Sequence, residues 1–308
     1  MKTLHLFAGA GGGIIADMML GNIPLAAVEI DPFCRSVLKA RQDDGSLPFF
    51  PIFDDVRSFD GSMFRGRVDC ISGGFPCQDV SIAGNGAGIY GSESRLFFDL
   101  ARVVRQVRPK LIFLENSPLI ISRGIDSVAG EMVALGYCGG WLVLPASAVG
   151  ALHKRERWFG LFADSDCKHG EKCSLAESME KAQLGFNELC EQIPHPLRGE
   201  ALRGGLGFAE NFEPGYSERG KIEYDFRLRG DSQSRLGRVV NGLASGLDGC
   251  KPSDFVFWSS DEWGIPRITE HCKNRRKRLI SIGNGQVPAC AAVAFLILFE
   301  MLKSADLV

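Results

Sequence analysis

The sequence predicts an α/β protein built on a parallel sheet, and three observations support this fold class. Short apolar runs alternate with helix-forming segments through the first 165 residues. A glycine-rich turn at residues 9–13 separates the first apolar run from the first helical segment. Apolar residues make up 45% of the chain and charged residues 23%, as in an ordinary folded domain. Repeated strand–helix–strand order favours one sheet with helices on both faces.

The expected elements follow one another in a regular order. Apolar runs predict strands at residues 3–7, 25–30, 68–72, 110–115, 141–145 and 158–163. Helical periodicity predicts helices that begin near residues 14, 32, 93 and 125. Asp31 is placed to cap the second of these helices, and Pro32 suits its first turn.

The chain changes character near residue 164. From there to about residue 263 it is rich in glycine, serine and charged residues, with weak periodicity. Residues 287–302 then predict a helix that is too hydrophobic to stand alone, so we expect it to pack back on the N-terminal sheet. This pattern indicates a large domain, 1–163 and 279–308, and a smaller loop-rich domain, 164–278.

Composition argues against several classes of protein. No run approaches the roughly 18 apolar residues of a membrane span, so we expect no membrane partner and a cytoplasmic location. Ten cysteines without a repeated spacing favour free thiols. Cys167, His169 and Cys173 could begin a zinc site, but no second pair follows, and we expect no metal.

The net charge of -2 argues neither for nor against binding of nucleic acid. The basic clusters at 154–157 and 273–278 could be solvated faces or nucleic-acid contacts.

The turn after the first strand is typical of a nucleotide-binding loop. Glycines at positions 9 and 11–13 allow a tight turn and a close approach of the backbone to a ligand. Glu29 ends the next strand, where an acidic residue commonly accepts hydrogen bonds from a ribose. A dinucleotide or S-adenosylmethionine would fit, although the glycine spacing misses the dinucleotide fingerprint by one position. The glycines could also merely shape the turn.

The strand at 68–72 leads into Gly73-Gly74-Phe75-Pro76-Cys77-Gln78. Ligands of open α/β sheets sit beyond the carboxyl ends of the strands, so chemistry is expected at Cys77. A thiolate is a suitable nucleophile for an electron-poor ring carbon. An isolated cysteine is more often a packed thiol, but a Gly-Gly-Phe-Pro loop is unsuited to mere packing.

These motifs together resemble the DNA cytosine-5 methyltransferases of the phage and bacterial type. The resemblance covers roughly residues 3–163 and 236–300. It implies a Rossmann-like S-adenosylmethionine-dependent methyltransferase fold, with target recognition in the smaller domain. Matching positions imply cofactor binding by Phe7, Gly9, Gly11, Gly12, Glu29, Asp55, Pro76 and Asn284. They imply catalytic roles for Cys77, Glu115, Arg155 and Arg157, and DNA contacts for Gln78, Ser81, Arg95 and Arg238.

The resemblance also implies a mechanism. Cys77 would add to C6 of a cytosine rotated out of duplex DNA, Glu115 would act at N3, and the two arginines would hold the carbonyl oxygen or phosphates. The methyl group would come from S-adenosyl-L-methionine. We expect a monomer whose partner is duplex DNA, with a cognate restriction endonuclease as a further candidate.

Some positions depart from the family pattern, and rival functions stay open. Ser117 and Pro118 follow Asn116 where valine is common, and His153 stands where glutamine usually precedes the paired arginines. The rivals are an RNA (tRNA) cytosine-5 methyltransferase, a nicotinamide-dependent oxidoreductase, and a DNA-binding relative without activity. The imperfect glycine fingerprint opposes the oxidoreductase, and the presence of Cys77 and Glu115 opposes the inactive relative.

Overall fold

The structure is a computed structural model that describes residues 1–76, 96–149, 151, 154–166, 274–305 and 307–308. It also describes the backbone of two short paired strands, β8 (Gly215–Tyr216) and β9 (Ile222–Glu223). Most of the segment 164–278 lies outside the described residues, so the division into two domains stays a prediction.

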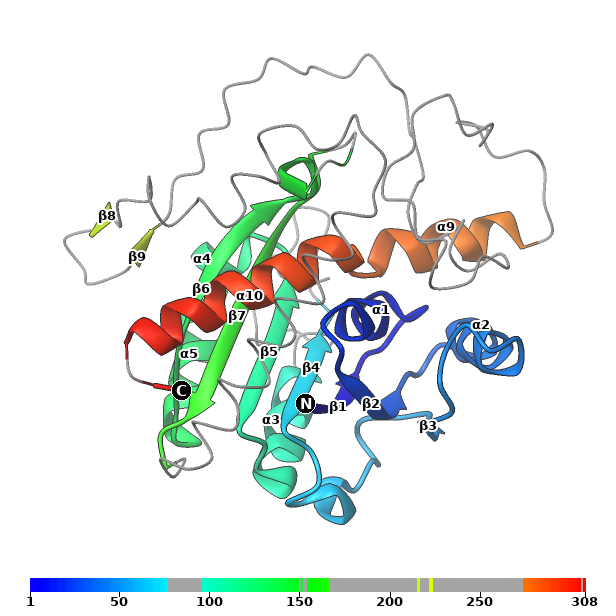
Figure 1. Cartoon of the computed structure of the whole chain (residues 1–308), viewed down its shortest axis with the longest axis horizontal. Helices are drawn as coiled ribbons and strands as arrows, with labels where there is room; N and C mark the ends of the chain where they lie inside the picture. The colour runs from blue at the N-terminus through cyan, green and yellow to red at the C-terminus, as the bar shows by residue number, and fades with distance from the viewer. Residues whose placement is uncertain are drawn as a thin grey trace.

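A seven-stranded sheet forms the centre of the molecule, with strand order β3-β2-β1-β4-β5-β7-β6 (Figure 1). Its strands are β1 (Lys2–Leu6), β2 (Ile23–Val28), β3 (Ile52–Phe53), β4 (Cys70–Gly74), β5 (Leu111–Asn116), β6 (Tyr137–Pro145) and β7 (Glu156–Asp164). The expected α/β class is confirmed, and each predicted strand overlaps an observed one.

The expectation of an entirely parallel sheet is wrong at β7. This strand runs antiparallel to both of its neighbours, β5 and β6. The reason is the short connection between β6 and β7, residues 146–155, whose described residues form the 3-10 turn η3 (Ala146–Val149) and no longer helix. A connection of this kind turns the chain back beside itself, whereas a parallel neighbour needs a longer crossover, usually a helix.

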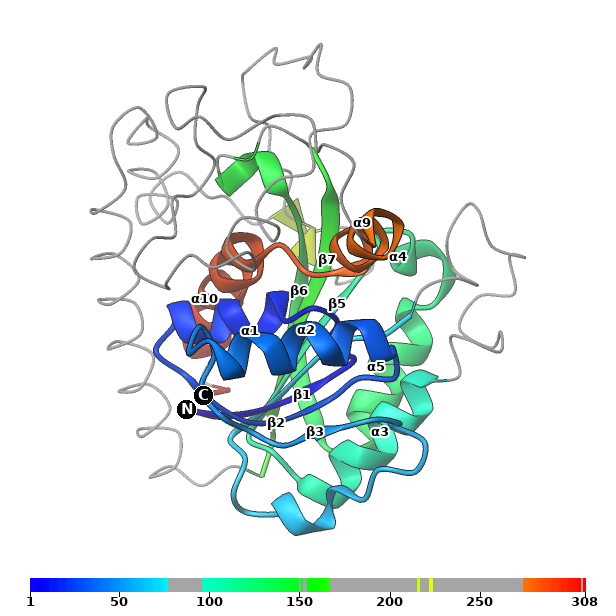
Figure 2. The ribbon, with the colours of Figure 1, turned by 90° about the vertical axis from the view of Figure 1, so that its right-hand side faces the viewer.

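Helices cover both faces of the sheet (Figures 1 and 2), as predicted. One face packs against α3 (Leu96–Val107), α4 (Ile120–Arg123), α5 (Ile125–Ala134) and the 3-10 turn η1 (Gly61–Phe64). The other packs against α1 (Gly12–Met19), α2 (Pro32–Asp43) and α10 (Pro288–Ser304). The Asp31 carboxylate accepts a hydrogen bond of 2.8 Å from the backbone N–H of Phe33, which confirms the predicted cap of α2.

The C-terminal helix α10 returns to the sheet, as expected from its sequence. Phe295 lies edge-on to Phe113 of β5, with ring centroids 5.1 Å apart. Together with α9 (Arg275–Asn284), this segment is long and apolar enough to cross a membrane by composition, yet 61% of its most apolar window is buried inside the protein. We therefore assign α10 to the core.

The strand order reverses between β1 and β4, which are neighbours although β2 and β3 separate them in the sequence. At such a switch point the loops leave the two strands on opposite sides and open a crevice beyond their carboxyl ends. The loop after β1 holds the predicted cofactor glycines, and the loop after β4 leads to Cys77. The topology therefore brings the two predicted motifs to one place.

Candidate active site

The loop after β1 is tightly wound. Phe7, Gly9 and Gly11 all have positive φ, at 56°, 56° and 97°. A Cβ added to Gly9 would meet no atom within 4 Å, so the backbone is open to a ligand there. The Gly9 N–H donates a 2.7 Å hydrogen bond to the Glu29 carboxylate, which joins the loop to the end of β2.

Glu29 is buried, with only 8% of its surface exposed, directly after β2. Its other carboxylate oxygen accepts a 2.8 Å hydrogen bond from the N–H of Asp31. Burial raises the pKa of Glu29, although both backbone hydrogen bonds oppose this. Each oxygen keeps a further lone pair, as ribose binding would require.

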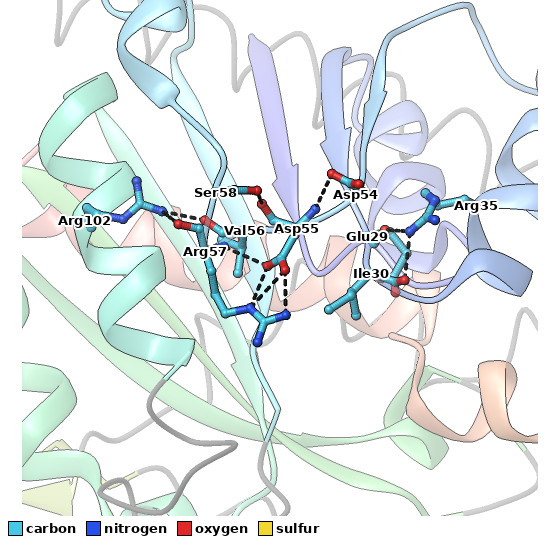
Figure 3. A network of polar contacts seen from close by, with 9 residues as sticks. All are labelled: Glu29, Ile30, Arg35, Asp54, Asp55, Val56, Arg57, Ser58 and Arg102. Carbon is cyan, nitrogen blue, oxygen red and sulfur yellow. Dashed lines mark hydrogen bonds and ion pairs between the residues drawn. The ribbon is translucent and has the colours of Figure 1, made fainter.

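Asp55 lies two residues after β3, the strand that pairs with β2, and belongs to the polar network of Figure 3. The Arg57 guanidinium donates to both Asp55 oxygens, at 2.9 and 2.6 Å, and its pairing lowers the pKa of Asp55. Both Asp55 oxygens therefore already accept hydrogen bonds in this structure, and the expected contact of Asp55 with the cofactor stays a prediction. Ile30, which the sequence did not single out, is 55% exposed beside Glu29 and offers an apolar surface for a flat ring.

Residues 283–288, which include Asn284 and are called the C-terminal motif below, lie against the glycine loop. A Cβ on Gly12 would overlap the backbone carbonyl of Gln286, and a Cβ on Gly13 would lie 2.8 Å from the Gln286 side-chain oxygen. Asn284 ends α9 and is exposed. The absence of a side chain at Gly12 therefore leaves room for the backbone of Gln286. This packing requirement for glycine is separate from the expected contact of Gly12 with the cofactor.

We expect Gly12→Ala to lower the free energy of unfolding by about 1–3 kcal/mol, since the methyl group would force the Gln286 backbone to move. Urea unfolding would measure the change. Gly130→Ala is the control, because that glycine also lacks a positive φ and a Cβ there would meet no atom within 4 Å. A Gly12→Ala protein no less stable than the Gly130→Ala protein would contradict the close contact.

Glu115 lies near the end of β5, beside Gly74 of β4 in the parallel register. It is 7% exposed, and a Cβ on Gly74 would lie 2.8 Å from its Oε2. The Arg157 Nε lies 3.0 Å from its Oε1. Burial raises the pKa of Glu115 although Arg157 and Arg155 both oppose the rise. Such a carboxyl can hold a proton that an exposed glutamate would lose.

The start of the Cys77 loop is fixed from two sides. The Asn116 side chain donates a 3.2 Å hydrogen bond to the backbone carbonyl of Phe75. The Phe75 ring is buried and packs on Phe97, in the first turn of α3, with centroids 5.1 Å apart. Phe75 and Phe97 stand just outside the two ends of segment 77–95, so this contact brings the ends of that segment together.

Arg155 and Arg157 lie in different environments, although the sequence pairs them. Arg155 has a φ of 32° and donates to the backbone carbonyls of Gly283 and Gly285, at 2.6 and 2.7 Å. These carbonyls lie at the C-terminal end of α9, where a cation is favourable. Arg157 instead pairs with Glu115. The structure therefore gives Arg155 a role in holding the C-terminal motif and Arg157 a place beside the candidate acid.

This difference predicts separable effects of two matched substitutions. Arg155→Lys should lower the free energy of unfolding by about 1–3 kcal/mol, because an ammonium cannot reproduce the fixed geometry of a guanidinium on two carbonyls. Arg157→Lys should mainly lower kcat, because it loosens Glu115. Thermal unfolding and steady-state kinetics of both variants would measure this, and equal effects on both quantities would contradict the assignment.

The cysteines that the structure describes do not offer a rival thiolate. Burial raises the pKa of Cys34 to about 11 and that of Cys290 to about 12, and it raises the pKa of Cys70 well above its usual value. Cys138 is exposed and lies on β6, away from the switch point. Cys77 therefore stays the predicted nucleophile.

Several predicted residues lie outside the described part of the chain: Cys77, Gln78, Ser81, Arg95, Arg238 and the zinc candidates Cys167, His169 and Cys173. Pro76 is described and half-buried at the start of the Cys77 loop. Within the described ranges, no group of three or more His, Cys, Asp or Glu residues could hold a metal ion.

Comparison with known proteins agrees with this geometry. The family model for C-5 cytosine-specific DNA methylases matches residues 1–196. The type II methyltransferase M.CviJI of Paramecium bursaria Chlorella virus IL3A is 39% identical over 167 residues, which cover 54% of this chain and 44% of that protein. M.HhaI of Haemophilus parahaemolyticus is 32% identical over 161 residues, 51% and 47% of the two chains. The solved structure of the Entamoeba histolytica methyltransferase EhMeth is 13% identical, covers 55% of each chain and has a TM-score of 0.46.

The chain belongs to the C-5 cytosine-specific DNA methylase family, whose cofactor is S-adenosylmethionine. It spans about half the length of the curated relatives it matches. The residues around the switch point fit this cofactor: Glu29 for a ribose, exposed Ile30 for a ring, and an open backbone at Gly9. A buried Gln286 oxygen without a partner also lies beside the glycine loop.

Proposed function

We propose that this protein transfers a methyl group from S-adenosylmethionine to C5 of a cytosine in duplex DNA, at a specific short sequence. The observation that carries the proposal is Glu115, a buried carboxyl with a raised pKa, one strand away from the switch point of the sheet. It stands beside β4, the strand that leads to Cys77, and β4 in turn pairs with β1, whose following loop holds the glycines. Methylation of this kind would protect DNA in a restriction–modification system, with a cognate endonuclease as partner and the methyltransferase acting as a monomer in the cytoplasm.

C5 of cytosine is a poor nucleophile, and covalent addition at C6 makes it reactive. The thiolate of Cys77 forms the new S–C6 bond, and the displaced electron pair moves through the ring toward N3. Glu115 gives its proton to N3, or shares it, as this charge develops. The C5 carbon then takes the methyl group that the sulfonium cofactor supplies.

The ring is restored by two bond cleavages. A base removes the proton from C5, and the electron pair of that C–H bond re-forms the C5–C6 double bond as the thiolate of Cys77 leaves. Glu115 recovers its proton from N3. Arg157, which pairs with Glu115 at 3.0 Å, keeps the carboxyl oriented through both stages.

This chemistry needs a base that is turned out of the duplex, because C6 is not accessible inside the stack. Gln78, Ser81 and Arg95 would contact DNA around the flipped base, and Arg238 would contribute from the smaller domain. Phe7, Gly9, Gly11, Gly12, Glu29, Asp55, Pro76 and Asn284 would surround the cofactor. Among these, Glu29 has the buried, hydrogen-bonded carboxylate that ribose hydroxyls suit best.

Transfer of labelled methyl groups to duplex DNA and to tRNA by the purified protein would test the proposal. Bisulfite sequencing of DNA from cells that express the protein would then identify the methylated cytosine and its sequence context. We expect labelling of DNA at one short motif. Labelling of tRNA alone would favour an RNA cytosine-5 methyltransferase, and labelling of neither would overturn the proposal.

A further inference from the structure

Arg102 of α3 reaches across to the turn that follows β3 (Figure 3). Its guanidinium donates to the backbone carbonyls of Val56 and Phe59, at 2.5 and 2.9 Å, and to that of Arg57, at 3.3 Å. One side chain therefore holds three successive parts of residues 56–59. A guanidinium suits this task because its donors lie in a fixed plane.

The Arg102 guanidinium is itself held from its own helix. The Asp99 carboxylate, one turn earlier, lies 3.6 Å from its Nε. The Gln106 side-chain oxygen, one turn later, accepts from it at 3.3 Å and also accepts from the backbone N–H of Gly61 at 2.9 Å. The position of the donors is therefore set by α3 and its neighbours.

The turn that these donors hold begins at Asp55. The Asp55 carbonyl accepts a 3.0 Å hydrogen bond from the N–H of Phe59, which closes the turn. The N–H of Glu29 donates to the carbonyl of Phe53, the last residue of β3, at 2.9 Å. Asp55 therefore lies at the same carboxyl edge of the sheet as Glu29, where the nucleoside end of the cofactor is expected.

The Asp55 carboxylate can serve a ligand only when its pairing with Arg57 opens. The Arg57 side chain is 60% exposed, and exposed ion pairs contribute little to stability. Arg102 holds the main chain of the turn and not the Asp55 carboxylate, so the exchange of Arg57 for a ligand would leave the turn in place.

We propose that Arg102 is a positioning residue for cofactor binding, which holds the turn from α3 and so keeps the Asp55 carboxylate where the nucleoside end of S-adenosylmethionine can reach it. This inference rests on the cofactor of the proposed function and on the expected contact of Asp55 with it. A turn that is already ordered favours binding, because the ligand need not order it. Arg102 takes no part in the chemistry, so its loss should act on cofactor affinity and not on the rate of the saturated enzyme.

Arg102→Gln and Arg105→Gln form a matched pair of variants. Arg105 lies on the same helix, but its guanidinium is 65% exposed and pairs with Glu131 of α5 at 3.2 Å. We expect Arg102→Gln to weaken binding of S-adenosylhomocysteine, measured by calorimetry, roughly tenfold, a common size for coupling between neighbouring residues. Arg105→Gln should change it by less than about twofold. The KM for S-adenosylmethionine should rise with Arg102→Gln, whereas kcat at saturating cofactor and the KM for DNA should stay within about twofold of the wild type.

A double-mutant cycle with Asp55→Ala tests the route of the effect. In the Asp55→Ala background, Arg102→Gln should weaken S-adenosylhomocysteine binding by less than about twofold, because the group that it positions is gone. A loss that persists in this background, or an Asp55→Ala variant that binds as the wild type does, would overturn the inference. Equal losses in Arg102→Gln and Arg105→Gln, or a fall in kcat without a change in KM, would also overturn it.

Thermal unfolding would show whether Arg102→Gln is folded at the assay temperature. If it is not, Arg102→Lys takes its place with the same expected outcomes, because an ammonium keeps the charge but lacks the planar set of donors. A wild-type protein that binds S-adenosylhomocysteine but methylates no DNA would overturn the proposed function alone. Unchanged binding by Arg102→Gln in a protein that does methylate DNA would overturn the inference alone, and a wild-type protein that does not bind S-adenosylhomocysteine would overturn both.

Discussion

Glu115→Gln is expected to lower kcat for cytosine methylation by roughly 10²–10⁴, the usual contribution of a general acid. Glutamine keeps the shape of the side chain but cannot give a proton to N3. Because Glu115 touches neither Gly9 nor Glu29 in the described contacts, the Kd for S-adenosylhomocysteine should be unchanged. Rapid-quench methylation assays and calorimetry would measure both quantities.

The pH dependence gives a second measure of the same role. Burial raises the pKa of Glu115, so the protonated form persists to higher pH than in an exposed glutamate. The wild-type rate should fall as the pH rises through this raised pKa, and the rate of Glu115→Gln should lack that fall. A variant with the same pH profile as the wild type would show that a different group supplies the proton.

The raised pKa of Glu115 also makes the stability of the folded protein depend on pH. This dependence can be measured without an activity assay. A carboxyl whose pKa is raised in the folded state stabilises the protein fully below its unfolded pKa, near 4.5, and this contribution is lost as the pH rises through the folded pKa. Glutamine has no such dependence. The free energy of unfolding of Glu115→Gln, relative to the wild type, should therefore increase as the pH rises above 4.5 and through the raised pKa of Glu115. The unpaired Arg157 adds a cost to the variant at every pH, so only the change with pH is diagnostic.

The strands were predictable from the sequence because each is a short apolar run with a polar or glycine boundary. The direction of β7 was not, since residues 158–163 read the same in either direction. What determines the direction is the connection from Pro145 to Glu156, which is too short for a crossover helix. The predicted elements were local patterns, and the error arose because the direction of a strand depends on the length of the connection that precedes it.

In the candidate site, too, the sequence reveals residues that a local pattern marks and misses contacts between distant residues. Glu29 and Glu115 could be found because each lies at the carboxyl end of an apolar strand, and the two strands flank the switch point. The contacts of Gln286 with Gly12 and of Arg155 with Gly283 join residues more than a hundred positions apart, and no local signal marks them. Ile30 was missed because a single exposed aliphatic residue is common on protein surfaces.

Cys77→Ala is expected to abolish methylation entirely, since no other group described at the switch point can add to C6. Cys77 follows Phe75 by two residues in the sequence. Phe75 is itself fixed by Asn116, the neighbour of Glu115. The last described residues before the predicted nucleophile are therefore held beside the strand of the predicted acid.

A mechanism-based substrate tests the covalent step directly. Duplex DNA with 5-fluorocytosine at the target site should form a stable adduct with the wild-type protein, because fluorine cannot leave as a proton does and the S–C6 bond then persists. Denaturing gel electrophoresis would detect this adduct, which Cys77→Ala should lack while still binding S-adenosylhomocysteine. Cys290→Ala is the matched control, because burial raises the pKa of that thiol to about 12 and leaves it no thiolate at neutral pH. Methylation or adduct formation by Cys77→Ala would show that another residue attacks the base, whereas loss of both in Cys77→Ala, with both retained in Cys290→Ala, would assign the attack to Cys77.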